Sequence, residues 1–117
     1  MVVDDDPDMR AYLLEVLKPA YDVSSAVDGA EGLDLVRRSK PDLVILDLLM
    51  PRMHGFEVCR KIREDAELSG TKVLISSSKS YQHDQRTALE GGADRYLVKP
   101  YGVADLMKTV EELLGAA

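Results

Sequence analysis

The chain has 117 residues, of which 45% are hydrophobic and 31% are charged, and its formal net charge at pH 7 is −6. This length fits one domain that buries its core without disulfides or structural metals, and the composition is typical of globular proteins. The acidic balance argues against direct nucleic-acid binding, whose affinity comes mainly from neutralising phosphates. The sequence contains no apolar run long enough to cross a bilayer and no leader-like N-terminus, so we expect a cytoplasmic domain without membrane association.

The first element in chain order is the apolar run MVV, which predicts a short strand. A helix is expected to begin at Pro7 with Asp6 as its N-cap. A carboxylate can accept hydrogen bonds from the first free N–H groups of a helix, and proline suits the first helical position. The apolar residues of this helix share one face, as helical periodicity requires; they are Met9, Leu13, Val16 and Leu17.

The runs YDVSSA and DLVIL predict the second and third strands, each followed by a helix. The first of these helices begins at DGAE, where Asp28 and Glu31 have the spacing of a capping box. The next helix follows Gly55, and Phe56, Cys59 and Ile62 recur on one of its faces. This position predicts that the single cysteine is a small buried hydrophobe, with a redox or metal-binding thiol as the alternative.

The runs KVLIS and RYLV predict the last two strands. Between them lies the polar segment YQHDQRTALEGG, a weakly periodic helix that ends at a glycine pair. A final helix from Val103 aligns Leu106, Val110, Leu113 and Leu114 on one face. Five strand–helix units in strict order predict a parallel sheet with helices on both faces.

In such sheets the functional site lies outside the carboxyl ends of the strands. The first strand is followed by the acidic run at positions 4–6, and the third by Asp47. The fourth is followed by serines at positions 76–78, and the fifth by Lys99. The second strand ends in apolar Ala26, which places it to one side of the site. Carboxylates, a hydroxyl and an ammonium group should therefore converge at one edge of the sheet.

With Asp6 used as a helix cap, Asp4, Asp5 and Asp47 share this cleft. Two carboxylates about 5 Å apart repel by roughly 3 kcal/mol at an effective dielectric near 20, so the cluster needs a cation. Oxygen ligands without a nearby cysteine or histidine suit Mg²⁺ better than zinc. A cation beside a lysine and a hydroxyl forms a site for a phosphoryl group.

Four spaced motifs, VVDDD, LVILDLLMP, VLISSS and YLVKPY, resemble those of the receiver domain of bacterial two-component response regulators. The resemblance covers the whole chain. It implies a single receiver domain over residues 1–117. It also implies a flavodoxin-like (βα)5 fold, a doubly wound five-stranded parallel sheet with strand order 2-1-3-4-5.

The resemblance also implies roles for the carboxylates. Asp47 would be the residue that a sensor histidine kinase or phosphotransfer protein phosphorylates. Asp5 and Asp47 would ligate Mg²⁺ together with the backbone carbonyl of Leu49, and Asp4 would hold a water molecule of the ion. The domain would catalyse only its own phosphorylation and slow dephosphorylation. Its phosphorylated state would signal to an output domain or a separate downstream protein.

By the same resemblance, Ser77 and Lys99 would contact the phosphoryl oxygens, and Tyr96 would change rotamer when Ser77 moves. The neighbouring serines leave the register of Ser77 open by one residue. A cis peptide bond is expected before Pro100, because Lys99 must reach back over the sheet edge before the chain turns into the final helix. Where this family usually has an acidic residue, the chain has His54, which we expect to be a surface or loop residue.

Three other functions compete with the receiver interpretation. A phosphatase of the haloacid dehalogenase type has a second aspartate two positions after its nucleophile, where this chain has Leu49. A flavodoxin-type cofactor site needs a Ser/Thr/Gly phosphate loop after the first strand, and the acidic run would repel that phosphate. A degenerate receiver that acts only as a docking module stays open, although Asp4, Asp5, Asp47 and Lys99 are all present. No motif identifies the kinase, the pathway, the output or the oligomeric state.

Overall fold

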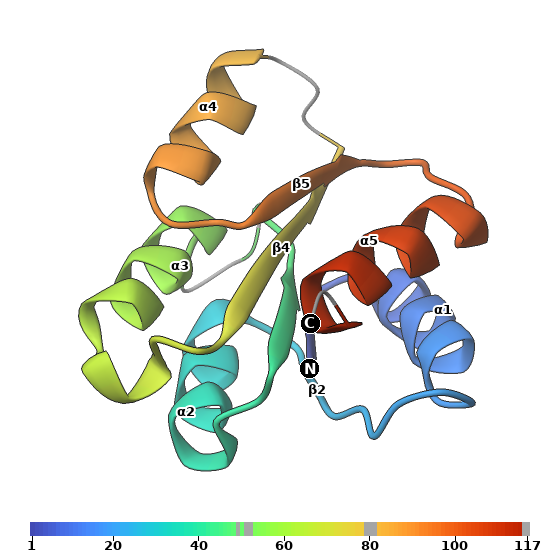
Figure 1. The fold of residues 1–117 in the computed structure, drawn as a ribbon, viewed down its shortest axis with the longest axis horizontal. Helices are drawn as coiled ribbons and strands as arrows, with labels where there is room; N and C mark the ends of the chain where they lie inside the picture. The colour runs from blue at the N-terminus through green and yellow to red at the C-terminus, as the bar shows by residue number, and fades with distance from the viewer. Residues whose placement is uncertain (49, 51–52, 79–81, 116–117) are drawn as a thin grey trace.

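The structure is a computed structural model that describes residues 1–48, 50, 53–78 and 82–115, without the side chains of residues 82–84. Strands and helices alternate through this part of the chain (Figure 1). In order they are β1 (Val2–Val3), α1 (Pro7–Leu17), β2 (Ser25–Ala26), α2 (Gly29–Ser39), β3 (Leu43–Leu46), α3 (Gly55–Glu64), the 3-10 turn η1 (Ala66–Leu68), β4 (Lys72–Ser77), α4 (Gln82–Glu90), β5 (Arg95–Val98) and α5 (Val103–Gly115).

The five strands are parallel and form one sheet in the order β2-β1-β3-β4-β5. This confirms the predicted fold class and the predicted position of β2 at the edge. The second strand is shorter than the run YDVSSA suggested. Only Ser25–Ala26 pair with β1, because β1 itself offers just Val2–Val3. Pairing on both sides buries β1 completely in spite of its length.

Helices cover both faces of the sheet (Figure 1). On one face α1 and α5 bury apolar residues against the strands; this cluster contains Val2, Leu13, Leu17, Leu43, Ile45, Leu74, Leu106 and Val110. On the other face α2, α3 and α4 contribute to a second cluster, which includes Leu33, Val36, Val44, Leu46, Val58, Ile62, Val73, Ile75 and Ala88. Alternate residues of each strand therefore point to different clusters, as the pleat of a strand requires.

The helix starts follow the capping pattern of the sequence. The side chain of Asp6 accepts a hydrogen bond from the N–H of Asp8, and that of Asp28 accepts one from Glu31. Both predicted N-caps are confirmed. The helix expected after Gly55 is present as α3, but its N-cap was not foreseen: the Nδ1 atom of His54 accepts a hydrogen bond of 3.2 Å from the N–H of Phe56. His54 is thus the N-cap of α3 rather than a simple surface residue.

Cys59 is buried in the core with a free thiol, as predicted for a small hydrophobe. Burial raises the pKa of this thiol to about 11, so it stays protonated at neutral pH. Its Sγ lies 3.6 Å from the carbonyl oxygen of Gly91. The environment is therefore that of an inert buried cysteine.

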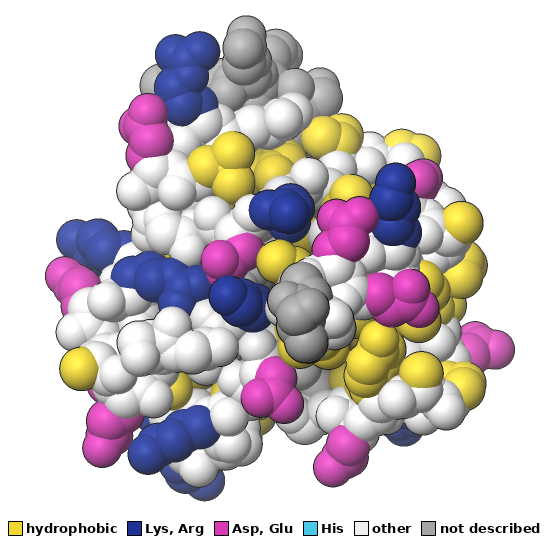
Figure 2. All heavy atoms as spheres, viewed as in Figure 1, with side chains coloured by type: hydrophobic (Ala, Val, Ile, Leu, Met, Phe, Trp, Pro, Cys, Tyr) yellow, Lys and Arg dark blue, Asp and Glu magenta, His cyan; other side chains and the backbone are white. Residues whose placement is uncertain are grey.

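Charged side chains of both signs are interspersed on the face that Figure 2 shows. A cavity of about 330 Å³ lies at the amino ends of the strands, between residues 21–23 and residues 41–43. The carboxyl ends of the strands, which hold the candidate site, lie at the opposite edge of the sheet from this cavity. Within the described part of the chain, no helix has both the length and the apolar character that a membrane span requires.

Candidate functional site

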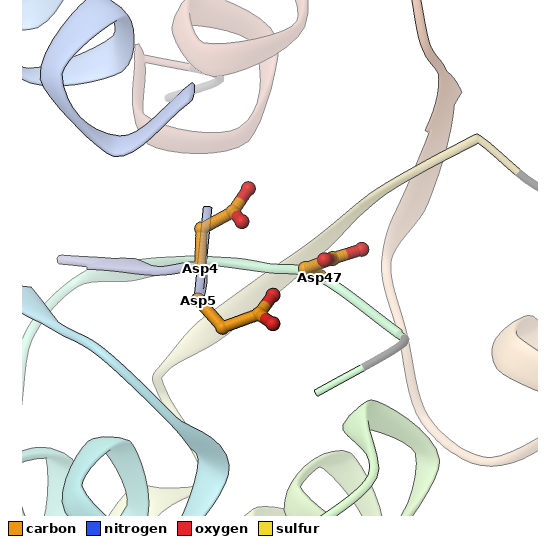
Figure 3. A group of neighbouring side chains, drawn as sticks. All are labelled: Asp4, Asp5 and Asp47. Carbon is orange, nitrogen blue, oxygen red and sulfur yellow. The ribbon is translucent and has the colours of Figure 1, made fainter. Parts of the chain in front are cut away.

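Three carboxylates meet at the carboxyl ends of the two central strands. Asp4 and Asp5 directly follow β1, and Asp47 directly follows β3, its neighbour in the sheet. One oxygen from each side chain lies within 4.8 Å of the others. Figure 3 shows the carboxylates of Asp4 and Asp5 extending toward the side on which Asp47 lies. The three aspartates that the sequence assigned to one cleft do share it.

The three carboxylates have different surroundings. Both oxygens of Asp4 are already bonded: Oδ1 accepts from the N–H of Asp6 at 3.0 Å, and Oδ2 accepts from the Nζ of Lys99 at 3.0 Å. Asp4 and Asp47 are buried, whereas Asp5 is exposed. Asp5 and Asp47 therefore have more capacity than Asp4 for a cation that enters from solvent.

Lys99 follows β5 and reaches across the end of the sheet. Its backbone N–H donates to the carbonyl oxygen of Ser77 at 2.8 Å. Its Nζ lies 3.0 Å from Asp4 Oδ2 and 3.9 Å from Asp47 Oδ1. The peptide bond between Lys99 and Pro100 is cis, as predicted from the turn that the chain must make there. The ammonium group consequently lies between the two buried carboxylates.

Asp47 has an unusual acidity for an aspartate. Burial raises the pKa of its carboxyl group to about 6, and Lys99 opposes this rise. The neighbouring carboxylates of Asp4 and Asp5 push the pKa further upward. Burial and like charges both disfavour the ionised form, so a cation at this cluster would favour it. The carboxylate is ionised at neutral pH and poorly solvated.

The structure separates the neighbouring serines of β4. Ser77 is buried at the end of the strand and pairs in register with Val98. Tyr96 pairs with Ile75, two residues before Ser77, so Tyr96 and Ser77 share one face of the sheet. Ser76 points to the opposite face, where its Oγ lies 2.7 Å from the hydroxyl of Tyr101. Leu49, whose carbonyl was expected to ligate the cation, lies outside the described residues.

Two contacts of the site were not foreseen. Arg10 donates from Nη1 to the backbone carbonyl of Asp4 at 2.8 Å, and Tyr101 bonds with Ser76. Neither contact has a local signal in the sequence, because each joins residues on different elements. Gly55 also matters, because a Cβ there would overlap the carbonyl oxygen of Asp47. Glycine allows the start of α3 to approach the end of β3 closely.

The donor set fits a hard divalent cation. The group consists of carboxylate oxygens only, with neither histidine nor cysteine among the described residues that form it. Mg²⁺ prefers oxygen ligands and keeps several waters, which the exposed position of Asp5 permits. The residues present therefore fit the metal that the sequence analysis suggested.

Comparison with known proteins agrees with this geometry. Residues 1–111 match the response regulator receiver domain family. The chain is 37% identical over 117 residues to the DNA-binding dual master transcriptional regulator RpaA of Synechocystis. This match covers 97% of the chain and 48% of RpaA. It is also 36% identical over 115 residues to the response regulator ArlR of Staphylococcus aureus, in a match that covers 97% of this chain and 51% of ArlR.

The fold is likewise similar to solved structures. The signal receiver domain of the putative response regulator NarL from Mycobacterium tuberculosis superposes with a TM-score of 0.91 at 31% identity, covering 99% of this chain and 94% of that one. The chain belongs to the response regulator receiver domain family, a family of signalling domains of two-component systems. It spans about half the length of the curated relatives that it matches.

Proposed function

We propose that this receiver domain accepts a phosphoryl group on Asp47 from a sensor histidine kinase or a phosphotransfer protein. The observation that supports this role most directly is the placement of Lys99 and the carboxylates of Asp4 and Asp5 around the buried Asp47. Burial raises the pKa of Asp47, and the ammonium group of Lys99 offsets part of that rise, whereas the carboxylates of Asp4 and Asp5 add negative charge that a bound cation would compensate. This arrangement suits a residue that gains further negative charge during its reaction.

In the proposed reaction, a carboxylate oxygen of Asp47 attacks the phosphorus atom of the donor. A new oxygen–phosphorus bond forms as the bond between phosphorus and the donor atom breaks, and the bonding pair leaves with the donor. Asp47 must be ionised to attack, which its pKa of about 6 allows at neutral pH. The product is a mixed anhydride that carries the signal.

The remaining residues stabilise charge. Lys99, whose Nζ lies 3.9 Å from Asp47 Oδ1, would neutralise oxygens of the incoming phosphoryl group. Asp5 and Asp47 would hold Mg²⁺, and Asp4 would hold a water molecule of the ion. When bound, the cation supplies positive charge that offsets repulsion between the carboxylates and the phosphoryl oxygens.

The signal would leave the site through β4 and β5. Ser77 is buried next to the site, and its hydroxyl is proposed to move toward the phosphoryl oxygens. Tyr96 lies on the same face of the sheet and packs partly buried against the core. Movement of Ser77 would free space for a different rotamer of Tyr96. An output domain or a separate protein would recognise the changed surface.

Incorporation of a phosphoryl group from acetyl phosphate tests the proposal. We expect the intact protein to gain one phosphoryl group in the presence of Mg²⁺ and none in EDTA. The Lys99→Ala variant should react more slowly, because it lacks the cation nearest Asp47. A wild-type protein that stays unlabelled with both acetyl phosphate and a phosphorylated histidine donor would instead indicate a degenerate receiver that acts only through docking.

A further inference from the structure

Ser76 is a polar residue in an apolar position. Ser76 is 1% exposed, and strand alternation places its side chain on the sheet face that α1 and α5 cover, two residues after Leu74. A buried hydroxyl without a partner costs free energy, so a serine here requires a hydrogen bond. Tyr101 provides it, with 2.7 Å between the two hydroxyl oxygens.

Tyr101 is well suited to hold this contact. Its ring packs partly buried against the apolar cluster under α1 and α5. Burial raises the pKa of its hydroxyl to about 12, so the group keeps its proton at neutral pH. A protonated phenol and a serine hydroxyl can each donate or accept, so the bond persists in either orientation. An apolar residue at position 76 would pack against the ring but would not fix its direction.

The hydrogen bond between Ser76 and Tyr101 lies close in the chain to Lys99, which the proposed reaction needs in a fixed position. Tyr101 is two positions after Lys99, whose backbone N–H donates to the carbonyl of Ser77 at 2.8 Å. The short segment from Lys99 to Tyr101 is thereby attached to two consecutive residues of β4, one at each end of the segment. Between these attachments, the Nζ of Lys99 reaches Asp4 at 3.0 Å.

We propose that Tyr101, acting through its hydrogen bond to Ser76, is a positioning residue for Lys99 in phosphoryl transfer to Asp47. Tyr101 holds the backbone beyond Lys99 against β4, and the lysine side chain then extends toward Asp4 and Asp47. A small displacement of a charged group in a reaction site lowers the rate strongly, by up to a hundredfold for about 1 Å. This inference rests on the proposed function of Asp47.

The test uses the whole chain and compares initial rates of phosphorylation by acetyl phosphate at saturating Mg²⁺. Tyr101→Phe removes the hydroxyl and keeps the ring, and Ser76→Ala removes the other partner. Ser76→Thr retains a hydroxyl and serves as the conservative variant. Tyr21→Phe is the matched control, because Tyr21 also packs against this cluster but lines the cavity at the opposite edge. Circular dichroism verifies that each variant is folded at the assay temperature.

We expect Tyr101→Phe and Ser76→Ala each to slow phosphorylation by at least threefold, and Ser76→Thr and Tyr21→Phe to react within twofold of wild type. The decisive comparison is made in the Lys99→Ala background. If Tyr101 acts through Lys99, then Tyr101→Phe causes no further loss there, whereas a general structural role would slow both backgrounds equally.

The possible results distinguish failure of the proposed function of Asp47 from failure of the positioning role of Tyr101. An unlabelled wild-type protein would contradict the proposed function itself. A labelled wild type with unchanged rates in Tyr101→Phe and Ser76→Ala would overturn the positioning role alone. The same conclusion follows if the loss in Tyr101→Phe persists at full size in the Lys99→Ala background. Should Tyr101→Phe fail to fold, Ser76→Ala in the two backgrounds provides the same comparison.

Discussion

Lys99 donates a hydrogen bond of 3.0 Å to Asp4, a residue 95 positions earlier in the chain. The side chain of Asp4 is 2% exposed and that of Lys99 is 19% exposed, so the pair is shielded from solvent. It joins the segment after β5 to the segment after β1. The same contact keeps the ammonium group 3.9 Å from Asp47. Asp4 therefore restrains the cation that the proposed reaction uses.

The Lys99→Met variant should destabilise the metal-free protein. Removing the ammonium leaves Asp4 and Asp47 as buried carboxylates without their cation, and the loss should be about 1–3 kcal/mol in the free energy of unfolding. Adding Mg²⁺ should recover part of the loss, because the ion offsets the same repulsion. Urea unfolding in EDTA and in Mg²⁺ measures both. A variant more stable than wild type in EDTA would contradict the account of the cluster.

The Asp5→Asn variant should show the opposite effect. It removes one of three repelling carboxylates, so the metal-free protein should become more stable, by up to about 1 kcal/mol because Asp5 is exposed and screened. The stabilisation that Mg²⁺ gives the wild type should shrink, because a ligand is lost. Asp22→Asn is the control, since it removes the same charge from an exposed residue at the opposite edge. A lower melting temperature of Asp5→Asn in EDTA would argue against repulsion.

The raised pKa of Asp47 predicts a pH dependence of stability. Burial raises this pKa from 3.8 to about 6, so between these values the folded protein holds a proton that the unfolded chain releases. The contribution of Asp47 to the free energy of unfolding is therefore greatest below about pH 4 and is lost as the pH rises through about 6. The loss is up to about 3 kcal/mol, at about 1.4 kcal/mol for each pH unit between the two pKa values.

The comparison that isolates this effect is wild type against Asp47→Asn in EDTA, because asparagine resembles the protonated acid and does not titrate. The stability of wild type relative to the variant should fall between pH 4 and pH 7. Urea unfolding at several pH values measures the difference. A difference that stays constant, or that rises with pH, would mean that the pKa of Asp47 is not raised.

Gly55 should be required for the local geometry of the site. A Cβ at this position would overlap the carbonyl oxygen of Asp47 and lie 2.8 Å from the Cα of Leu48. Gly55→Ala should therefore cost about 1–3 kcal/mol, as overpacking does in well-packed regions. Gly70→Ala is the matched control, because nothing lies within 4 Å of a Cβ there. Equal thermal stability of the two variants would show that α3 can move away without cost.

Much of this architecture is readable from local patterns. The capping residues Asp6 and Asp28 mark helix starts because their side chains bond within a few positions. Apolar runs mark strands, and the rule that sites lie at carboxyl strand ends brings Asp4, Asp5 and Asp47 together without knowledge of any contact. The strict alternation of strands and helices then predicts a parallel sheet with helices on both faces, whereas the strand order was implied by the family resemblance.

Contacts between distant elements could not be read in this way. The bond between Ser76 and Tyr101 depends on which face each side chain takes, and the serine run leaves that face ambiguous. His54 was not expected as a cap, because histidine is uncommon in that role and its Nδ1 must be turned toward the helix. The length of β2 depends on how much of β1 is available beside it, and not on its own residues.

In the proposed reaction Asp47, rather than Asp4 or Asp5, carries the phosphoryl group. Mass spectrometry of peptides from protein treated with acetyl phosphate and Mg²⁺ tests it most directly, with hydroxylamine to convert the labile acyl phosphate into a stable derivative. We expect the derivative on Asp47 alone, and none in a folded Asp47→Asn variant treated in parallel. Derivative on Asp4 or Asp5 in wild type, or undiminished labelling of the folded Asp47→Asn variant, would contradict the account.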